Sequence, residues 1–192
     1  ITDSEFDESA FVEFRRRLDA ETALLKDWLA QGRLRSRQRC FGFEIEGWLI
    51  DAQARPVARN QEFLAALEDP MVVPELALFN FEINSDPVNL APGALDKTHD
   101  ALLARWRHCE EAAGGLGLRP LMTGILPTVR SCDLSLARMS PLQRYRAIND
   151  QVFRLRRGKP IELDIRGAEH LRHQHDDVML EAGTTSLQIH VL

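Results

Sequence analysis

The first part of the chain has the periodicity of a helix. Between positions 8 and 37, apolar residues recur at spacings of mostly three and four, and charged residues occupy the other faces. This spacing predicts one long amphipathic helix or two consecutive ones, closed by the basic stretch RLRSRQR. The same period predicts three further helices, at 61–69, 92–117 and 139–158.

The last of these helices has a sequence typical of a helix start. Ser140 precedes Pro141, and proline is favoured at the first helical position because it has no N–H to leave unpaired. We therefore predict Ser140 as the N-cap of this helix.

Alternation of apolar and polar positions predicts the strands. The clearest case is FGFEIEGWLID, where Phe41, Phe43 and Ile45 share one face of an extended segment. Other strands are predicted at 76–88, 118–127, 159–167 and 184–192. Strands and helices alternate irregularly, and no strand is followed by a glycine-rich loop and a helix. The pattern therefore predicts an α+β fold rather than a doubly wound α/β fold.

Composition and charge exclude several classes of partner. The 192 residues carry a formal charge of −5, and 44% of them are hydrophobic, which is typical of one globular domain. No basic patch suits a nucleic acid, and no apolar run approaches the ~18 residues of a membrane helix. Three widely spaced cysteines favour a reducing compartment, so we expect a cytoplasmic protein. We expect residues 1–192 to form a single domain that is the N-terminal portion of a longer one, because the chain stops within the alternating pattern SLQIHVL.

Two acids in the first strand point to a metal. If residues 41–51 are extended, Glu44 and Glu46 project from the same face, about 6.5–7 Å apart along the strand. Carboxylates this close repel each other, and a hard cation such as Mg²⁺ or Mn²⁺ would neutralise them. The alternative is a solvated strand face that carries two acids of no special function.

Two other strands carry similar groups. Glu82 lies between Phe81 and Ile83, and Glu75 begins the same segment. In the last strand His190 lies between two apolar residues, with Gln188 two positions earlier on the same face. A metal-capable group in an apolar setting on each of three strands favours the metal site over the solvated face.

Together these segments resemble a known family. GFEIEGWLID looks like the opening strand of glutamate–cysteine ligases and related carboxylate–amine ligases, which have Gly-x-Glu-x-Glu followed by apolar residues. PELALFNFEINSDPV is similar to their second segment, and TTSLQIHVL is similar to the later strand that supplies a histidine. Their order and approximate spacing agree over most of the chain.

The resemblance implies a fold and a reaction. The family shares the glutamine synthetase-like catalytic domain, a curved, mostly antiparallel sheet flanked by helices, of which this chain would be the N-terminal half. The implied cofactor is Mg²⁺ or Mn²⁺, with ATP as co-substrate. A glutamate-like carboxylate would be joined to an amine such as cysteine through an acyl phosphate. By position the metal ligands would be Glu44, Glu46, Glu82 and His190, with Glu75 as a further candidate.

The substrates are not defined by the resemblance. Relatives carry a Thr-His-Pro-like element after the third strand, but TGILPTV has Leu126 where the histidine is expected. We expect Arg166, at a strand end beside a glycine, and Gln188 to contact substrate. Glu181 either caps backbone amides or faces the metal ligands.

Two other residue groups are assigned no site. The histidines of AEHLRHQHDD are predicted to lie in a solvated connection rather than a zinc site. Arg144 and Tyr145 are predicted to lie on a helix surface. Two functions remain as alternatives: a metal-dependent hydrolase that uses the same site, and a non-catalytic module that binds a nucleotide or an amino acid.

Overall fold

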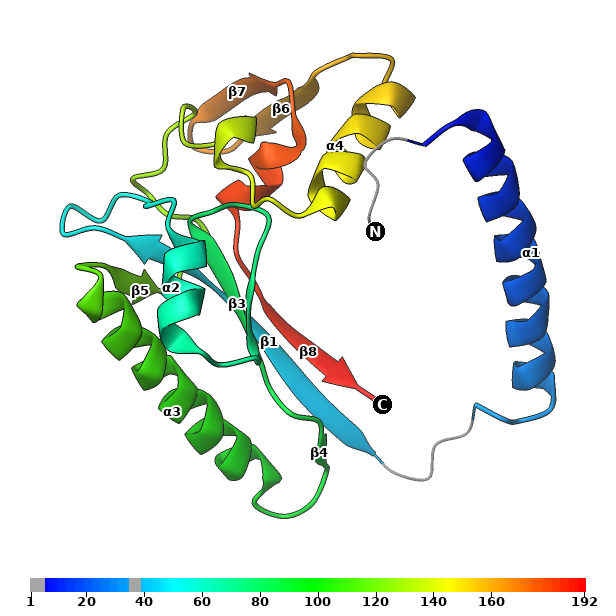
Figure 1. Cartoon of the computed structure of the whole chain (residues 1–192), viewed down its shortest axis with the longest axis horizontal. Coiled ribbons are helices and arrows are strands. Elements are labelled where there is room, and N and C mark those ends of the chain that lie inside the picture. Colours follow the sequence, from blue (N-terminus) through cyan, green and yellow to red (C-terminus); the bar gives the residue numbers. More distant parts are fainter. Residues whose placement is uncertain (1–5, 35–38) are drawn as a thin grey trace.

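The computed structural model describes residues 6–34 and 39–192. These residues form four α-helices and two sheets, and Figure 1 shows how they are arranged. The helices are α1 (Glu8–Ala30), α2 (Asn60–Leu67), α3 (Ala94–Gly115) and α4 (Gln143–Leu155). The main sheet contains β1 (Cys40–Ile50), β2 (Val72–Pro74), β3 (Asn80–Asn84), β4 (Val88–Asn89), β5 (Arg119–Leu121) and β8 (Leu187–Val191). A separate hairpin is formed by β6 (Ile161–Arg166) and β7 (His170–His175), and two short 3₁₀ helices are η1 (Leu136–Arg138) and η2 (Val178–Gly183).

Strand β1 organises the main sheet. It pairs antiparallel with β3 and β4 on one side and with β5 and β8 on the other, and β2 extends the sheet beyond β3. Every pairing in the sheet is antiparallel, and helices pack against it, so the predicted α+β class with an antiparallel sheet flanked by helices is confirmed.

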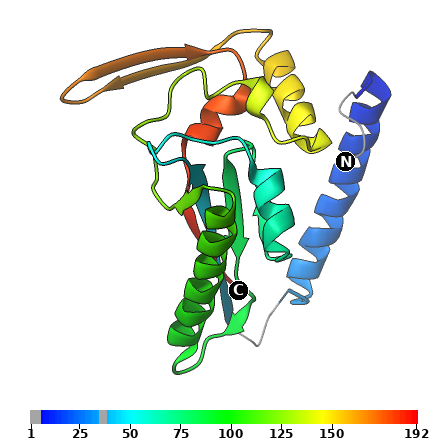
Figure 2. The same ribbon diagram turned by 60° about the vertical axis from the view of Figure 1, so that its left-hand side comes forward.

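One face of this sheet is covered by α2 and α3 (Figure 2). The alternate residues Ile45 and Leu49 of β1 and Phe81 and Ile83 of β3 point toward these helices and are buried there. They pack against Phe63, Leu67, Cys109 and Ala113 of the helices. Because side chains alternate along a strand, the residues between them point to the opposite face, which α2 and α3 do not cover.

A second core closes one end of that opposite face. Trp48 is fully buried and stacks on Phe79, with the ring centroids 5.4 Å apart and the planes 1° from parallel. Its indole Nε1 donates to the carbonyl of Thr123 at 3.1 Å and to Thr185 Oγ1 at 3.2 Å. Leu126 is buried in the same core, so the residue at the expected histidine position has a packing role in this fold.

The histidine-rich segment is largely exposed, as predicted, but it forms strand β7 rather than a connection. Antiparallel pairing joins Leu163 to His173 and Ile165 to Leu171, so the hairpin has one face with apolar side chains and histidines. The other face is polar and contains Glu162, Asp164, Arg166, His170, Arg172 and Gln174. The alternation of these two classes is what makes the segment a strand.

The predicted N-cap of α4 was also wrong. The helix begins at Gln143, and the N-cap position is occupied by Leu142, which makes no side-chain capping bond. Ser140 is fully buried: its hydroxyl donates to the carbonyl of Glu75 at 2.5 Å and accepts from Asn60 Nδ2 at 3.1 Å. Ser140 therefore connects two other segments of the chain.

Other predicted elements are present with different bounds. The segment 76–88 forms only β3 and, after Asp86-Pro87, the first residue of β4. Helix α1 ends at Ala30, and positions 35–37 of the predicted helix lie outside the described residues. Helix α1 has no buried residue among those described and stands apart from the sheet in Figure 1. Within residues 6–34 and 39–192, no helix is both long and apolar enough to cross a membrane.

Candidate metal and substrate site

The predicted acids lie on the sheet face that α2 and α3 leave uncovered. Glu46 of β1 is directly opposite Glu82 of β3, and Glu44 is directly opposite Asn84. One residue separates Glu44 from Glu46, and one separates Glu82 from Asn84, so all four side chains point to the same face of the sheet. Like charges directly opposite each other in a sheet are destabilising.

Strand β8 brings its polar residues to the same face. Gln188 is opposite Glu44, and His190 is opposite Gly42. His190 Nε2 lies 3.1 Å from Glu44 Oε1, a diagonal contact between adjacent strands. The structure therefore places Glu44, His190 and Gln188, three of the predicted site residues, side by side.

Glu46 is held by the start of β8. Its carboxylate accepts hydrogen bonds from the backbone N–H and the hydroxyl of Ser186, both at 2.9 Å, and from Gln188 Nε2 at 3.2 Å. These bonds fix the carboxylate between β1 and β8. Gln188 thus orients the predicted metal ligand Glu46, and its contact with substrate stays a prediction.

Glu75 and Glu82 form a second pair of neighbouring carboxylates. Glu75 directly follows β2, and its own carboxylate accepts the N–H of Leu76 at 2.9 Å. Burial raises the pKa of Glu75 to about 7, and the nearby carboxylates of Glu82 and Glu46 act in the same direction. Glu82 accepts a hydrogen bond from Asn84 Nδ2 at 2.7 Å. A proton or a cation between these acids would relieve their repulsion.

Two further residues border the same acids: Glu181, for which the sequence left two roles open, and Asn80, to which it gave none. A small cavity is lined by Glu46, Glu75, Glu181 and Asn80, among others. Burial and the charge of Glu46 raise the pKa of Glu181. Asn80 is buried, and its Nδ2 has no hydrogen-bond partner within residues 6–34 and 39–192. An orphaned amide beside three carboxylates is typical of a site that a ligand completes. The sequence signal for Asn80 was weak, because it is one polar residue among the apolar residues of LFNFEI.

The chemical types of the predicted metal ligands suit a hard divalent cation. Carboxylate oxygens with one imidazole are the ligands that Mg²⁺ and Mn²⁺ accept, and cysteine sulfur is not part of the set. In the ranges 6–34 and 39–192, no three His, Cys, Asp or Glu side chains are already grouped closely enough to hold an ion. Glu46 and Glu82 accept hydrogen bonds from neighbouring protein groups, and Glu44 lies against His190.

Arg166 is not brought to these acids. It lies in the β6–β7 hairpin, on the polar face, where its side chain is exposed and its Nε is 3.2 Å from Asp164 Oδ1. Its role in substrate binding stays a prediction.

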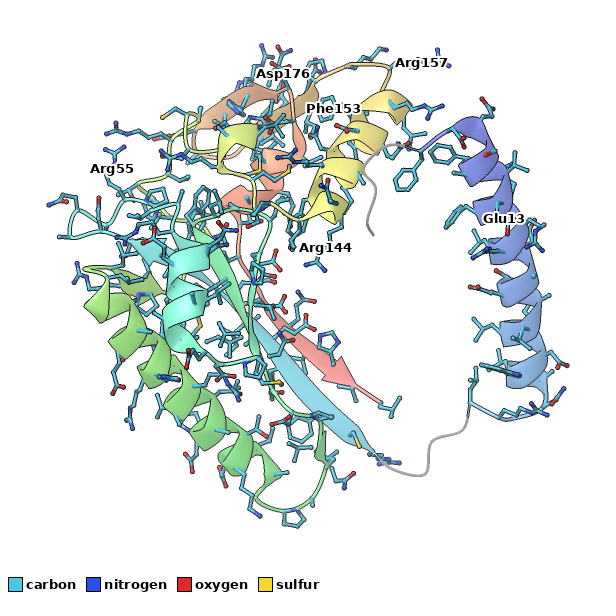
Figure 3. All side chains as sticks on the ribbon, viewed as in Figure 1. Glu13, Arg55, Arg144, Phe153, Arg157 and Asp176 are labelled. Atoms are coloured by element: carbon cyan, nitrogen blue, oxygen red, sulfur yellow. The ribbon has the colours of Figure 1, made fainter. Side chains whose placement is uncertain are left out.

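A different arginine lies closer to the acids. Arg144, in the first turn of α4, donates to the Tyr145 hydroxyl at 2.8 Å. That bond, together with the charges of Glu75 and Glu82, raises the pKa of Arg144. Figure 3 shows its side chain pointing from α4 toward the main sheet. Tyr145 is buried and its hydroxyl lies 3.3 Å from the carbonyl of Pro74, so the prediction of a helix surface was wrong for this residue.

Comparison with known proteins identifies one family. Residues 40–192 match the family model described as glutamate-cysteine ligase family 2 (GCS2). The match includes β1, β3 and β8 and leaves out α1. No curated protein and no solved structure gives a significant match.

Proposed function

The chain belongs to glutamate-cysteine ligase family 2, and on that basis we propose that it is an ATP- and Mg²⁺-dependent carboxylate–amine ligase. Membership of the family indicates ligase-type activity. The finer proposal is that a glutamate-like carboxylate takes the terminal phosphoryl group of ATP. The resulting acyl phosphate is captured by an amine, with release of ADP and phosphate.

One observation carries this proposal. Strands β1, β3 and β8 present Glu44, Glu46, Glu82 and His190 on a single face of the sheet, where the pair Glu46 and Glu82 is directly opposed. A fold gains nothing in stability from opposed acids on a sheet, so their arrangement is better explained by a cation that binds between them.

The residues of this face have distinct proposed roles. Glu44, Glu46, Glu82 and His190, with Glu75, would hold Mg²⁺ or Mn²⁺. When bound, the metal would neutralise phosphate charge and orient the phosphoryl transfer. Gln188 and Ser186 position the Glu46 carboxylate through their hydrogen bonds. We keep Arg166 as a proposed contact for a substrate anion.

Nucleotide turnover tests the proposal. ADP release is measured with Mg²⁺, ATP and glutamate against a panel of amines that includes cysteine. The wild-type protein is compared with Glu46→Gln and with Glu111→Gln, which removes an exposed acid on α3. We expect amine-dependent ADP release that Glu46→Gln lacks and Glu111→Gln retains.

Other outcomes contradict the ligase. ADP release that needs no amine would indicate the metal-dependent hydrolase. Nucleotide or amino-acid binding without turnover in any pairing would indicate the non-catalytic module.

A further inference from the structure

A large apolar cleft adjoins the acidic face. Its volume is about 950 Å³, which is in the range of small-molecule sites. One wall is the inner face of the β6–β7 hairpin, and the others are formed by α4, η2 and the segment after β5. The apolar side chains in it include Ile125, Leu134, Ile148, Leu163, Ile165 and Leu171.

Several of these side chains are exposed although they are apolar. Ile165 is 56% exposed, Leu171 is 53% exposed and Ile148 is 50% exposed. They come from the hairpin and from α4, and all of them line one cleft rather than being scattered over the surface. A ligand with an apolar body would remove these side chains from water, which favours its binding.

One end of the cleft is acidic. Glu75 and Glu181 both line it, and both also line the small cavity that contains Glu46. Among the described residues, neither Glu75 nor Glu181 forms an ion pair with a lysine or arginine side chain. The cleft therefore leads from an apolar chamber to two carboxylates that have no lysine or arginine partner among the described residues, next to the predicted metal ligand Glu46.

The remaining polar lining is sparse. His173 of β7 lies in the hairpin wall, where its Nε2 is 3.4 Å from His175 Nδ1. Tyr145, Ser131 and Thr184 are also present. Arg130 contributes the single arginine among the lining residues, and its side chain is exposed.

We propose that this cleft binds the amine co-substrate and that this amine is a primary ammonium compound with a bulky apolar body. The ammonium group lies against Glu181, at the edge shared with Glu75, and the apolar body lies between the hairpin and α4. The carboxylates at one end of the cleft favour the ammonium group of such a molecule, and the apolar lining favours its apolar body. The inference rests on the proposed ligase function, and it narrows the amine from any small amine to a hydrophobic one.

Direct binding without ATP tests the site independently of turnover. The probes are phenethylamine, the neutral analogue 2-phenylethanol, and phenylalanine, titrated into the full chain by calorimetry. We expect saturable binding of phenethylamine that Ile165→Ser weakens about tenfold, the equivalent of about 1.4 kcal/mol. Glu162→Ser, on the outer face of the same strand, is the matched control and should bind like wild type.

The ammonium contact has its own test. Glu181→Gln should weaken phenethylamine at least fivefold and leave the affinity for 2-phenylethanol unchanged. Circular dichroism of each variant confirms that it is folded. Absence of saturable phenethylamine binding, or equal affinity in wild type, Ile165→Ser and Glu181→Gln, would overturn the inference.

Two further comparisons complete the assignment. If phenylalanine binds more tightly than phenethylamine, and Arg130→Gln removes the difference, the co-substrate is a hydrophobic amino acid. If phenethylamine binds more tightly than phenylalanine, the co-substrate is an amine without a carboxylate. ADP release that is as fast with ethylamine as with phenethylamine would overturn the inference and leave the ligase function intact. Binding of phenethylamine with no ADP release in any pairing would overturn the proposed function and leave the cleft as an amine site.

Discussion

Glu46 of β1 and Glu82 of β3 are directly opposed across an antiparallel ladder, on the face of the sheet that α2 and α3 do not cover. Glu75, next to Glu82, adds a third carboxyl group whose pKa is raised to about 7 by burial and by these neighbours. The sheet therefore concentrates negative charge at the place where it also gathers a histidine and an unpaired amide.

Removing one charge of the opposed pair should stabilise the metal-free protein. We expect Glu82→Gln to raise the free energy of unfolding by about 0.5 kcal/mol, because like charges directly opposite each other in a sheet are destabilising. The same substitution should abolish stabilisation by MgCl₂. Urea denaturation with and without MgCl₂ measures both effects, and Glu111→Gln on α3 is the control. Wild-type behaviour of Glu82→Gln in both conditions would contradict the role given to the pair.

The raised pKa of Glu75 predicts a loss of stability at higher pH. The carboxyl group titrates near pH 7 in the folded protein and near 4.5 when unfolded, so the fold favours its protonated form. The resulting stabilisation is complete below about pH 4.5 and is lost as the pH rises through 7. The expected loss is about 2 kcal/mol, since the group is only partly buried.

Unfolding curves of wild type and Glu75→Gln between pH 5 and 8.5 test this directly. The variant should lack this component of the pH dependence, and MgCl₂ should stabilise wild type more at pH 8 than at pH 6, because the cation favours the ionised carboxyl. Parallel pH profiles for the two proteins would show that Glu75 titrates normally.

Gly47 of β1 has no room for a side chain. A Cβ at this position would lie 2.6 Å from Phe81 Cζ, and Phe81 is fully buried between the sheet and the helices. We expect Gly47→Ala to cost about 1–3 kcal/mol through overpacking. Gly114 lies in α3 with open space around it, so Gly114→Ala should instead stabilise the protein by about 0.5–1 kcal/mol. Thermal unfolding of the two variants compares them, and a neutral Gly47→Ala would contradict the packing described here.

The buried amide of Asn60 joins three segments near Glu75. Its Nδ2 donates to the carbonyls of Ala77 and Asn80 and to Ser140 Oγ, and Ser140 in turn donates to the carbonyl of Glu75. Asn60→Ala should cost about 2–3 kcal/mol, because it leaves buried acceptors unpaired. The neighbouring exposed substitution Gln61→Ala should cost less than 0.5 kcal/mol. Equal stability of the two variants in urea would rule out a structural role for this network.

The sequence was sufficient to predict the strands that carry the acids. Alternation in FGFEIEGWLID implied that Glu44 and Glu46 share a face, and β1 confirms the strand with bounds one residue earlier. The same reasoning applied to Glu82, Gln188 and His190. Side chains alternate between the two faces of a strand, so residues two positions apart share a face whichever strands pair with it. The family resemblance is confirmed by the match over residues 40–192.

What could not be predicted depends on which segments meet. Ser140 has the sequence of an N-cap, but its hydroxyl is taken by the carbonyl of Glu75, 65 positions earlier. The sequence left open whether Glu181 faces the acids and gave Asn80 no role. Both line the cavity at Glu46 because η2 and β3 lie beside it. The His-rich strand β7 was missed because its apolar positions are few, and its pairing partner β6 supplies the rest of the apolar face.

The most direct test of the account is Mn²⁺ binding to the protein, followed by electron paramagnetic resonance of the free ion. We expect saturable binding by wild type, a loss of at least tenfold in affinity in Glu46→Gln and in Glu82→Gln, and no change in Glu111→Gln. Wild-type protein that leaves Mn²⁺ free, or that binds it equally well without Glu46 and without Glu82, would contradict the claim that these opposed acids form a metal site.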